Sequence, residues 1–382
     1  MDKQLIADRI REERKRCNLS QSDVAEHMGW GRSKHAIVVE VESGKREVKA
    51  WELYKLAQLF HIEVEDFFTA TSTETPLVLW REKPKEARTL KERQFLQRCE
   101  DYKFLEDILG EKLPIKRVLP RHKIDIHSAD RRGANEIADT VRKELNLGEF
   151  PAHTLLKVLE EHYSVKFLAL PLGKDVKDGS AACTFFDFGA AILLNEHEVP
   201  SRQTFSIAHE LFHIITWDVD LFNTVLPDPK LYKKNEQLAD AFAAGLLIPA
   251  MSLRQQMTRL QENGSVSHST LVAIAREYGV SIPALIYRLA YLGLIPQESV
   301  DQLLNDHSLV ALNKRSSAHS KVPTIRVGER FVRIAFLAYQ FGKISRSRLA
   351  RLLNTSLVSL ERFLESYGLV ENENDEIRLS NS

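Results

Sequence analysis

His209-Glu210-Leu211-Phe212-His213 lies near the middle of this 382-residue chain, within the largely apolar run 204–215. Residues four apart on a helix share one face, so His209 and His213 can point at the same metal ion. Glu210 would then lie beside that ion, where a carboxylate can act as a general base toward water. Two histidines and a glutamate in this pattern are typical of zinc peptidases. The alternative is a chance match on a core helix.

The residues around the motif favour a metal site. Because most of 205–215 is apolar, this helix should lie in a core. Two histidines and a glutamate would be costly to bury there without partners. A bound dication and supporting hydrogen bonds would offset that cost. Catalytic zinc usually has three protein ligands and one open position, so a third ligand is expected.

A second predicted helix, ending near Pro249, supplies that ligand. Its apolar residues recur at helical spacing: Leu238, Ala239, Phe242, Ala243, Leu246 and Leu247. Glu236 and Asp240 are four apart on the same helix. We interpret Glu236 as the third metal ligand and Asp240 as an acceptor that orients one of the histidines. The alternative for both residues is a solvated acidic edge near the start of the helix.

These two motifs resemble the ImmA/IrrE-type metallopeptidases, in which the histidine pair is followed by a helix of the pattern E-x-x-A-x-x-F-A-x-x-L-L-x-P. The matching positions are Glu236, Ala239, Phe242, Ala243, Leu246, Leu247 and Pro249. The resemblance also takes in an amphipathic helix at 134–147, a strand at 190–195 and a helix pair at 271–293. It implies a zincin-like domain with a small sheet, Zn²⁺ as cofactor, and site-specific cleavage of helix-turn-helix repressors. Phe212 stands where the family commonly has a small residue, which affects packing more than chemistry.

The amino terminus carries an independent signal. Ser20 is a good N-cap, and the segment that follows predicts a short helix closed by Gly29. This region resembles the Cro/repressor-type (XRE family) helix-turn-helix, in which the segment after Gly29 would enter the major groove of double-stranded DNA. The resemblance makes seven side chains candidates for DNA contact: Gln21, Arg32, Ser33, Lys34, His35, Lys45 and Arg46.

Two features of this segment depart from the family pattern. The spacing from Gly29 to 42–44 is about three residues longer than usual, and 37–41 is a β-branched run with poor helix propensity. The region is also mixed in charge, so a large electrostatic affinity for DNA is not implied. The alternative is a small helical domain that mediates protein contacts or dimerisation only.

Composition agrees with a multidomain globular protein. The hydrophobic content of 43% and charged content of 28% are ordinary, and 53 basic residues balance 53 acidic ones. No global attraction to nucleic acid or membrane follows. Cys17, Cys99 and Cys183 are widely separated, which fits a reducing compartment and argues against a cysteine-based metal cage. No signal peptide or apolar run of transmembrane length is visible, so we expect a cytoplasmic protein without a membrane partner.

We expect a mainly helical α+β fold in five segments. They are a helix-turn-helix domain at 1–70, a hinge and helical connector at 71–129, a metallopeptidase domain at 130–300, a linker at 301–322 and a winged-helix-like module at 323–382. The hinge is the Thr/Ser-rich stretch 69–75. The last module rests on three predicted helices, at 331–339, 345–353 and 357–368, and on a hairpin pairing 369–371 with 377–379.

These features together predict a DNA-binding transcriptional regulator with a built-in zinc endopeptidase. It would cleave a partner repressor or itself in a stress or mobile-element response, and a homodimer on two DNA half-sites is the default. A second hypothesis is a non-proteolytic regulator whose peptidase-like domain senses a metal or ligand. Glu210 argues against it, because sensing needs ligands but no general base. A third is an antitoxin-like regulator with a protein partner.

Three further residues are weighed for the catalytic site. Tyr232 and His197 could stabilise an oxyanion, although a structural role is the simpler interpretation of each. The thiolate of Cys183 could occupy an open zinc position, but its small apolar neighbours favour a buried core thiol.

Overall fold

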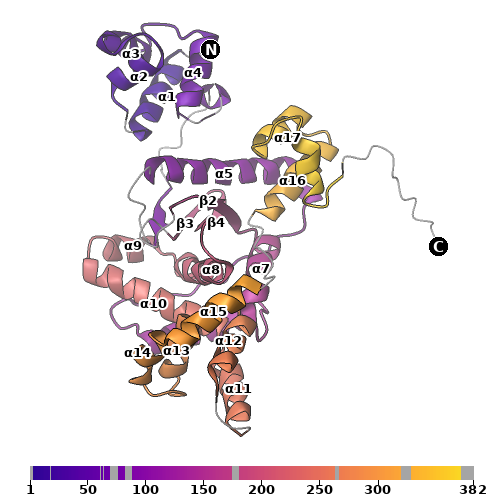
Figure 1. Cartoon of the computed structure of the whole chain (residues 1–382). Helices are drawn as coiled ribbons and strands as arrows, with labels where there is room; N and C mark the ends of the chain where they lie inside the picture. Colours follow the sequence, from indigo (N-terminus) through magenta and orange to yellow (C-terminus); the bar gives the residue numbers. More distant parts are fainter. Residues whose placement is uncertain are drawn as a thin grey trace, which may run out of the picture.

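The computed structural model describes residues 3–17, 19–60, 62, 64–68, 76–81, 88–173, 180–262, 266–319 and 328–370. Within these ranges the chain is mainly helical and contains one four-stranded sheet (Figure 1), which confirms the predicted mainly helical α+β class. The hinge predicted at 69–75 and the strand predicted at 377–379 lie outside the described residues. No described helix is both long and apolar enough to cross a membrane.

The N-terminal domain is a small helical bundle. It contains α1 (Lys3–Arg16), α2 (Gln21–His27), η1 (Arg32–Lys34), α3 (His35–Glu42), α4 (Ala50–Phe60) and η2 (Val64–Phe68). The Ser20 side chain accepts a hydrogen bond from the Asp23 amide at 3.1 Å, and the Asp23 carboxylate accepts one from the Ser20 amide at 2.9 Å. This reciprocal cap confirms the predicted start of α2. Gly29 follows the helix with a φ of 76°, as expected for its closing glycine.

The β-branched run 37–41 lies in α3 despite its low helix propensity. Val38 and Val41 are buried in the core of the N-terminal domain, against residues of α2 and α4. Burial of these two side chains outweighs the propensity cost, which is only a few tenths of a kcal/mol per residue.

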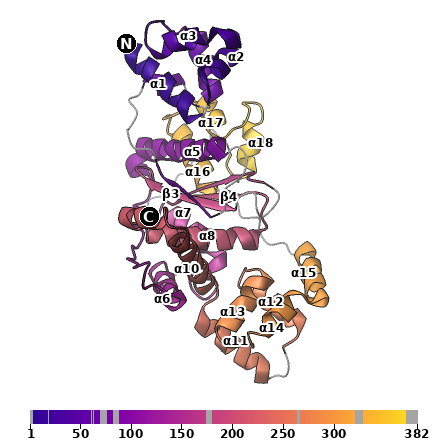
Figure 2. The same ribbon diagram turned by 90° about the vertical axis from the view of Figure 1, so that its left-hand side faces the viewer.

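The sheet lies at the centre of the molecule. It consists of β1 (Val78–Trp80), β2 (Lys166–Leu170), β3 (Ala181–Phe186) and β4 (Gly189–Asn195), in the order β1-β3-β4-β2. β2 pairs with β4 in parallel, and the other two pairs are antiparallel. Helix α5 (Arg88–Leu109) covers one face and α8 (Pro200–Ile215) the other (Figures 1 and 2).

Both faces of the sheet are buried, which explains why β4 is apolar throughout. Successive residues of β4 face opposite sides: Ile192 and Leu194 belong to the core on the α8 side, and Ala191 and Leu193 to the core under α5. Strand β1 was not predicted. It is three residues long and lies inside the segment expected to be hinge and connector.

Helices on the α8 side form the largest core. They are α6 (Arg131–Glu144), η4 (Pro151–His153), α7 (Leu155–His162), α9 (Val219–Val225) and α10 (Pro229–Leu247). Gly245 allows α10 to approach α6 closely, because a Cβ at this position would lie 2.5 Å from Oδ1 of Asn135. The helices α6 and α10 therefore hold each other in a fixed alignment.

A further group of helices continues this core away from the N-terminal domain. It comprises α11 (Ala250–Glu262), α12 (His268–Glu277), α13 (Ile282–Tyr291), α14 (Ser299–Leu304) and α15 (His307–His319). The pair α12 and α13 agrees with the prediction. The irregular linker predicted at 301–322 does not: α15 is a helix, with Asp306 accepting backbone hydrogen bonds at its start and Leu309 buried in the core. One buried leucine in a polar segment gave too weak an apolar period to indicate this helix.

The C-terminal module packs against α5. It contains α16 (Glu329–Gln340), α17 (Arg346–Leu352) and α18 (Leu360–Glu365), close to the three predicted helices. Its core includes Tyr102, Leu105 and Leu109 of α5, which is followed by η3 (Gly110–Lys112) (Figure 2). The predicted connector is therefore one long helix shared between two cores, packed on the sheet along one part and on the C-terminal module along another.

Candidate metal centre

Helix α8 presents both histidines of the motif inside the protein. Pro200 occupies its first turn, and His209 and His213 are 1% and 2% exposed. Their Nε2 atoms lie 3.2 Å apart, as the four-residue spacing predicts. The structure therefore brings two ring nitrogens to one point in the core.

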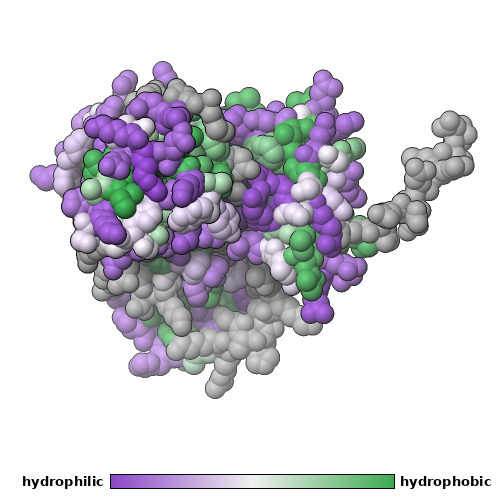
Figure 3. All heavy atoms as spheres, turned by 90° about the horizontal axis from the view of Figure 1, so that it is seen from above, coloured by the Kyte–Doolittle hydropathy of each residue, from purple (hydrophilic) through white to green (hydrophobic). Residues whose placement is uncertain are grey.

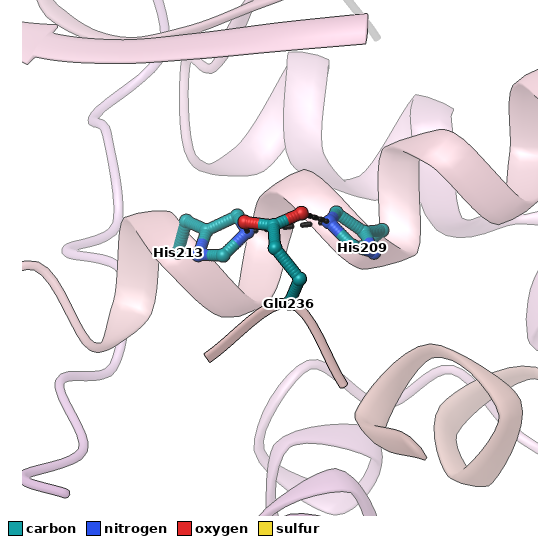
Figure 4. Close-up of side chains that lie close together, drawn as sticks. All are labelled: His209, His213 and Glu236. Carbon is teal, nitrogen blue, oxygen red and sulfur yellow. Dashed lines mark hydrogen bonds and ion pairs between the residues drawn. The ribbon is translucent and has the colours of Figure 1, made fainter. Parts of the chain in front are cut away.

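Glu236 of α10 completes this group. Its two carboxylate oxygens lie 3.2 Å from Nε2 of His209 and 3.3 Å from Nε2 of His213. Figure 4 shows the three side chains pointing toward one another. Within the described part of the chain, this is a group of three donors whose ligand atoms all lie within 4.8 Å of one another.

The spacing of the donors fits a tetrahedral cation. Zinc–nitrogen bonds of about 2.0–2.1 Å in tetrahedral geometry place neighbouring ligand atoms about 3.3 Å apart. The two imidazole Nε2 atoms, 3.2 Å apart, agree with that value, and each lies 3.2–3.3 Å from a different oxygen of Glu236. One imidazole pair and one carboxylate also form a donor set that zinc commonly has in catalytic sites.

Two side chains contact the Nδ1 atoms of the histidines and so orient the rings. The Asp240 carboxylate lies 2.9 Å from Nδ1 of His209, and its predicted role as a supporting acceptor stays a prediction. The Asn235 carboxamide lies 3.3 Å from Nδ1 of His213. Contacts at Nδ1 fix the ring and its tautomer, so that Nε2 faces the ligand position.

Arg81 and Asn235 are functional candidates that the sequence did not reveal. Arg81 follows β1 and forms an ion pair with Asp240 at 3.1 Å, across 159 residues of sequence. The position of Asn235, one residue before Glu236, was a usable signal, because the helix places both side chains near the α8 motif.

Charges within the site shift the pKa values of its members. Burial lowers the pKa of His209, but hydrogen bonds to Asp240 and Glu236 outweigh it and raise that pKa to about 9. Burial raises the pKa of Glu236, and the charge of His213 together with hydrogen bonds to both histidines brings it far below its ordinary value. The carboxylate is therefore ionised and available to a cation.

Glu210 is the buried carboxylate without a hydrogen bond in this site. It is fully buried, and neither of its oxygens has a hydrogen-bond partner among the described residues. Burial raises its pKa, while the charges of His209 and His213 act in the opposite direction. Such an unpaired group is costly in a core, which is a sign of a functional role.

The Cys183 thiol of β3 lies close to the Glu210 carboxylate and lowers its pKa, although the geometry falls short of a hydrogen bond. Burial raises the pKa of this thiol well above its ordinary value, and the Glu210 charge raises it further. These two effects favour the thiol over the thiolate.

A cavity of about 10 Å³ adjoins Glu210, His213 and Glu236. This volume corresponds to about one water molecule. Tyr232 and Trp80 line it as well, and the Tyr232 hydroxyl donates to the Trp80 carbonyl at 2.8 Å. Tyr232 thus reaches the site, whereas His197 is not among the residues that line this cavity.

The predicted DNA-contacting residues have different environments. Ser33, Lys34 and His35 are exposed around the start of α3, and Lys45 is exposed beyond its end. Arg32 begins the short helix η1 before α3. Figure 3 views the molecule from the side of this domain and shows a mostly hydrophilic face.

Two of the predicted contact residues have structural partners. Gln21 donates to the Glu42 carboxylate at 2.9 Å, and Glu42 is also paired with Arg14 at 2.5 Å. Arg46 pairs with Glu52 at 2.7 Å and lies over the Trp30 ring. Their interactions with DNA remain predictions.

The folds and the site define a class of protein: a helix-turn-helix domain joined to a metallopeptidase-type domain. Comparison with protein families agrees. Residues 160–290 match the IrrE N-terminal-like domain of peptidase family M78, and residues 10–67 match the helix-turn-helix family. The chain therefore combines an ImmA/IrrE-type domain with a DNA-binding helix-turn-helix domain of XRE type.

Comparison with individual proteins gives two further matches. The chain is 33% identical over 103 residues to the radiation response metalloprotease IrrE of Deinococcus deserti. This match covers 26% of the chain and 35% of the relative, so the chain spans about a third of that protein's length. A solved Mycobacterium tuberculosis transcriptional regulator aligns with 13% identity and a TM-score of 0.31, over 50% of this chain and 51% of that one.

Proposed function

We propose that this protein is a transcriptional regulator with a zinc-dependent endopeptidase domain that cleaves a repressor-type protein. The principal support is the buried group of His209, His213 and Glu236, with donor spacings that fit zinc, beside the unpaired carboxylate of Glu210. A site that only bound zinc would need the three donors. It would not need a further carboxylate left without a hydrogen bond in the core.

Each residue has a defined part in the proposed reaction. Zinc bound here would supply a Lewis acid and lower the pKa of a coordinated water. Glu210 would accept the proton of the attacking water and later release it to the leaving nitrogen. Burial raises the pKa of Glu210 above that of an ordinary glutamate, which favours its accepting a proton.

Tyr232 is the oxyanion donor that we favour. It lines the cavity next to Glu210 and Glu236, and its hydroxyl remains protonated because burial and these two carboxylates raise its pKa. To serve a substrate carbonyl, the hydroxyl would have to exchange its bond to the Trp80 carbonyl for one to the substrate.

The substrate class follows from the combination of domains. A helix-turn-helix domain on the same chain would bring the peptidase to regulatory DNA, where other repressors are bound. We infer cleavage of such a repressor, or of this chain itself, in a stress or mobile-element response. The matched relative is named as a radiation response metalloprotease, which is consistent with this role. A homodimer would place two helix-turn-helix domains on two DNA half-sites.

The test is a cleavage assay with the full chain, zinc and candidate helix-turn-helix repressors, with fragments identified by mass spectrometry. We expect Glu210→Gln to slow cleavage at least about 100-fold, since general bases contribute about 10²–10⁴-fold. The matched control is Glu196→Gln, an exposed glutamate near the start of α8, which should cleave at the wild-type rate. Equal cleavage by Glu210→Gln would exclude the proposed base. Zinc binding without cleavage of any repressor, combined with a zinc-dependent change in DNA affinity, would favour the sensor function.

A further inference from the structure

We propose that a groove between α6, α10 and α13 binds an organic carboxylate with an aromatic or apolar body. The groove has a volume of about 380 Å³, and its walls include Arg81, Arg131, Arg288, Phe205, Tyr287 and Tyr291. This volume lies within the range of about 300–1,000 Å³ that is usual for small-molecule sites. The inference does not depend on peptidase activity.

Arg288 is the residue that indicates an anionic ligand. Its side chain belongs to the core of α13 and is only 4% exposed. Nε donates to the Ile248 carbonyl at 3.0 Å, and one terminal nitrogen, Nη1, donates to Oδ1 of Asn135. Both acceptors are neutral. A guanidinium buried to this degree is normally paired with a carboxylate or phosphate.

No carboxylate within the described ranges forms an ion pair with Arg288. The aspartate whose charge reaches it is Asp139, which is paired with Arg142 at 2.7 Å. Burial lowers the pKa of Arg288 to about 10, which still leaves the group protonated near neutral pH. The groove therefore contains a permanent positive charge with no counter-ion beside it.

The groove contains more basic than acidic side chains. Arg131 lies at the start of α6 and has no ion-pair partner within the described residues. Arg81 is neutralised by Asp240, which also lines the groove. Three guanidinium groups thus face one carboxylate, and an added anion would restore the balance. The planar guanidinium group of arginine can bind a carboxylate through two parallel hydrogen bonds.

The aromatic side chains indicate the rest of the ligand. Tyr287 and Tyr291 lie one helical turn apart on α13 and are 56% and 44% exposed, which is unusual for two large rings beside a core. Arg288 lies 5.6 Å from the Tyr291 ring centroid, and Arg81 lies 5.4 Å from that of Phe205. Two cations of the groove therefore lie beside aromatic rings, which suits a ligand with a carboxylate on a ring.

The probe for this site is benzoate, titrated into the full chain by calorimetry. We expect saturable binding at one site per chain, weakened at least about tenfold by Arg288→Met, which keeps the side chain's length but removes its charge. Arg131→Met, on the exposed wall, should also weaken binding and guards against a folding defect at Arg288. Lys103→Met is the control, because this lysine lies on α5 outside the groove, does not act on the charge of Arg288 and should leave binding unchanged.

Further titrations test separately whether binding needs the charge of the ligand, whether it needs the ring, and whether the carboxylate belongs to a peptide or to a free acid. Benzamide lacks the charge and acetate lacks the ring, so both should bind at least about tenfold more weakly than benzoate. A capped phenylalanyl-glutamate dipeptide that displaces benzoate would identify an acidic peptide as the ligand, and one that fails to do so would identify a free acid. The proposal is overturned if benzoate shows no saturable binding, or if it binds both arginine variants as tightly as the wild type.

Discussion

Asp240 lies next to the candidate metal centre without being one of its three donors. It accepts a hydrogen bond from Nδ1 of His209 and is itself paired with Arg81. Its negative charge makes His209 a better donor to a cation, and its position holds the ring in place. Burial and hydrogen bonding therefore extend the site beyond the three residues that would bind the metal.

We expect Asp240→Asn to weaken zinc binding about 10- to 100-fold, because the substitution keeps the shape of the side chain but removes the charge behind His209. The affinity can be measured by competition with a chromophoric chelator. The control is Asp220→Asn, an exposed aspartate on α9, which should bind zinc as the wild type does. Unchanged affinity in Asp240→Asn would show that Asp240 is not a supporting residue.

Metal analysis should distinguish the proposed ligand His213 from the proposed base Glu210. We expect His213→Ala to lose stoichiometric zinc, because two donors remain of the three that surround the position. Glu210→Gln should retain one zinc per chain, since its carboxylate lies beside the group and not within it. Mass-spectrometric metal analysis after dialysis measures both, with His197→Ala as the control for histidine loss. Loss of zinc from Glu210→Gln would make Glu210 a ligand.

The sequence was most informative where chemistry depends on short spacing. His209, His213 and Glu236 were predictable because helical periodicity brings the histidines together and a second motif lies nearby. Arg81 was not, because its partner Asp240 is 159 residues away and the contact depends on how β1 joins the sheet. The missing hydrogen bonds of Glu210 are likewise a property of packing, which no local pattern contains.

At the scale of single elements, the fit between α6 and α10 depends on the absence of one side chain. We expect Gly245→Ala to destabilise the protein by about 1–3 kcal/mol, because the new Cβ would overpack against Asn135 and Ala138. In an open helix the same change would stabilise by about 1 kcal/mol. The sign of the change in unfolding free energy, measured in urea, therefore shows whether the contact between α6 and α10 requires glycine at position 245. Gln255→Ala, on the exposed side of α11, should stay within about 0.5 kcal/mol of the wild type.

Helices with clear caps or a regular apolar spacing were easier to predict than the others. The starts of α2 and the periodic helices α12, α13 and α16 follow from caps and apolar spacing that are visible in the sequence. Helix α15 does not, because its burial depends on one leucine and on packing against α12. Helix α3 also contradicts its own local propensity, since its valines gain more from the core of the N-terminal domain than they lose.

At the scale of the whole molecule, α5 connects the central sheet to the C-terminal module. Glu106 of α5 forms ion pairs with Lys166 of β2 at 3.1 Å and Arg330 of α16 at 2.8 Å. All three groups are buried, and Lys116 also pairs with Glu106 at 2.8 Å, so it is the removal of Glu106 that would leave the buried charge of Lys166 uncompensated. This cluster ties three elements that are far apart in sequence, which is why spacing alone predicted only a connector at this position.

Glu160 adds a pH-dependent element to the same junction. It is 2% exposed on α7 and accepts a hydrogen bond from the Tyr102 hydroxyl of α5 at 3.0 Å. Burial raises its pKa from the ordinary 4.5 to about 7, against the opposing effects of Tyr102 and Arg330. Between these two values the folded protein retains a proton that the unfolded chain has lost. Its contribution to stability is therefore present at low pH and declines as pH rises from about 4.5 to 7.

We expect Glu160→Gln to remove this decline, because glutamine resembles the protonated acid at every pH. The difference in unfolding free energy between variant and wild type should shift in favour of the variant as pH rises from 5 to 8, by up to about 3 kcal/mol. Urea unfolding at several pH values, followed by circular dichroism, measures this difference while effects common to both proteins cancel. Glu111→Gln, at an exposed position just beyond α5, should show no such trend. If the difference between Glu160→Gln and the wild type is the same at pH 5 and pH 8, Glu160 does not titrate differently in the folded and unfolded states.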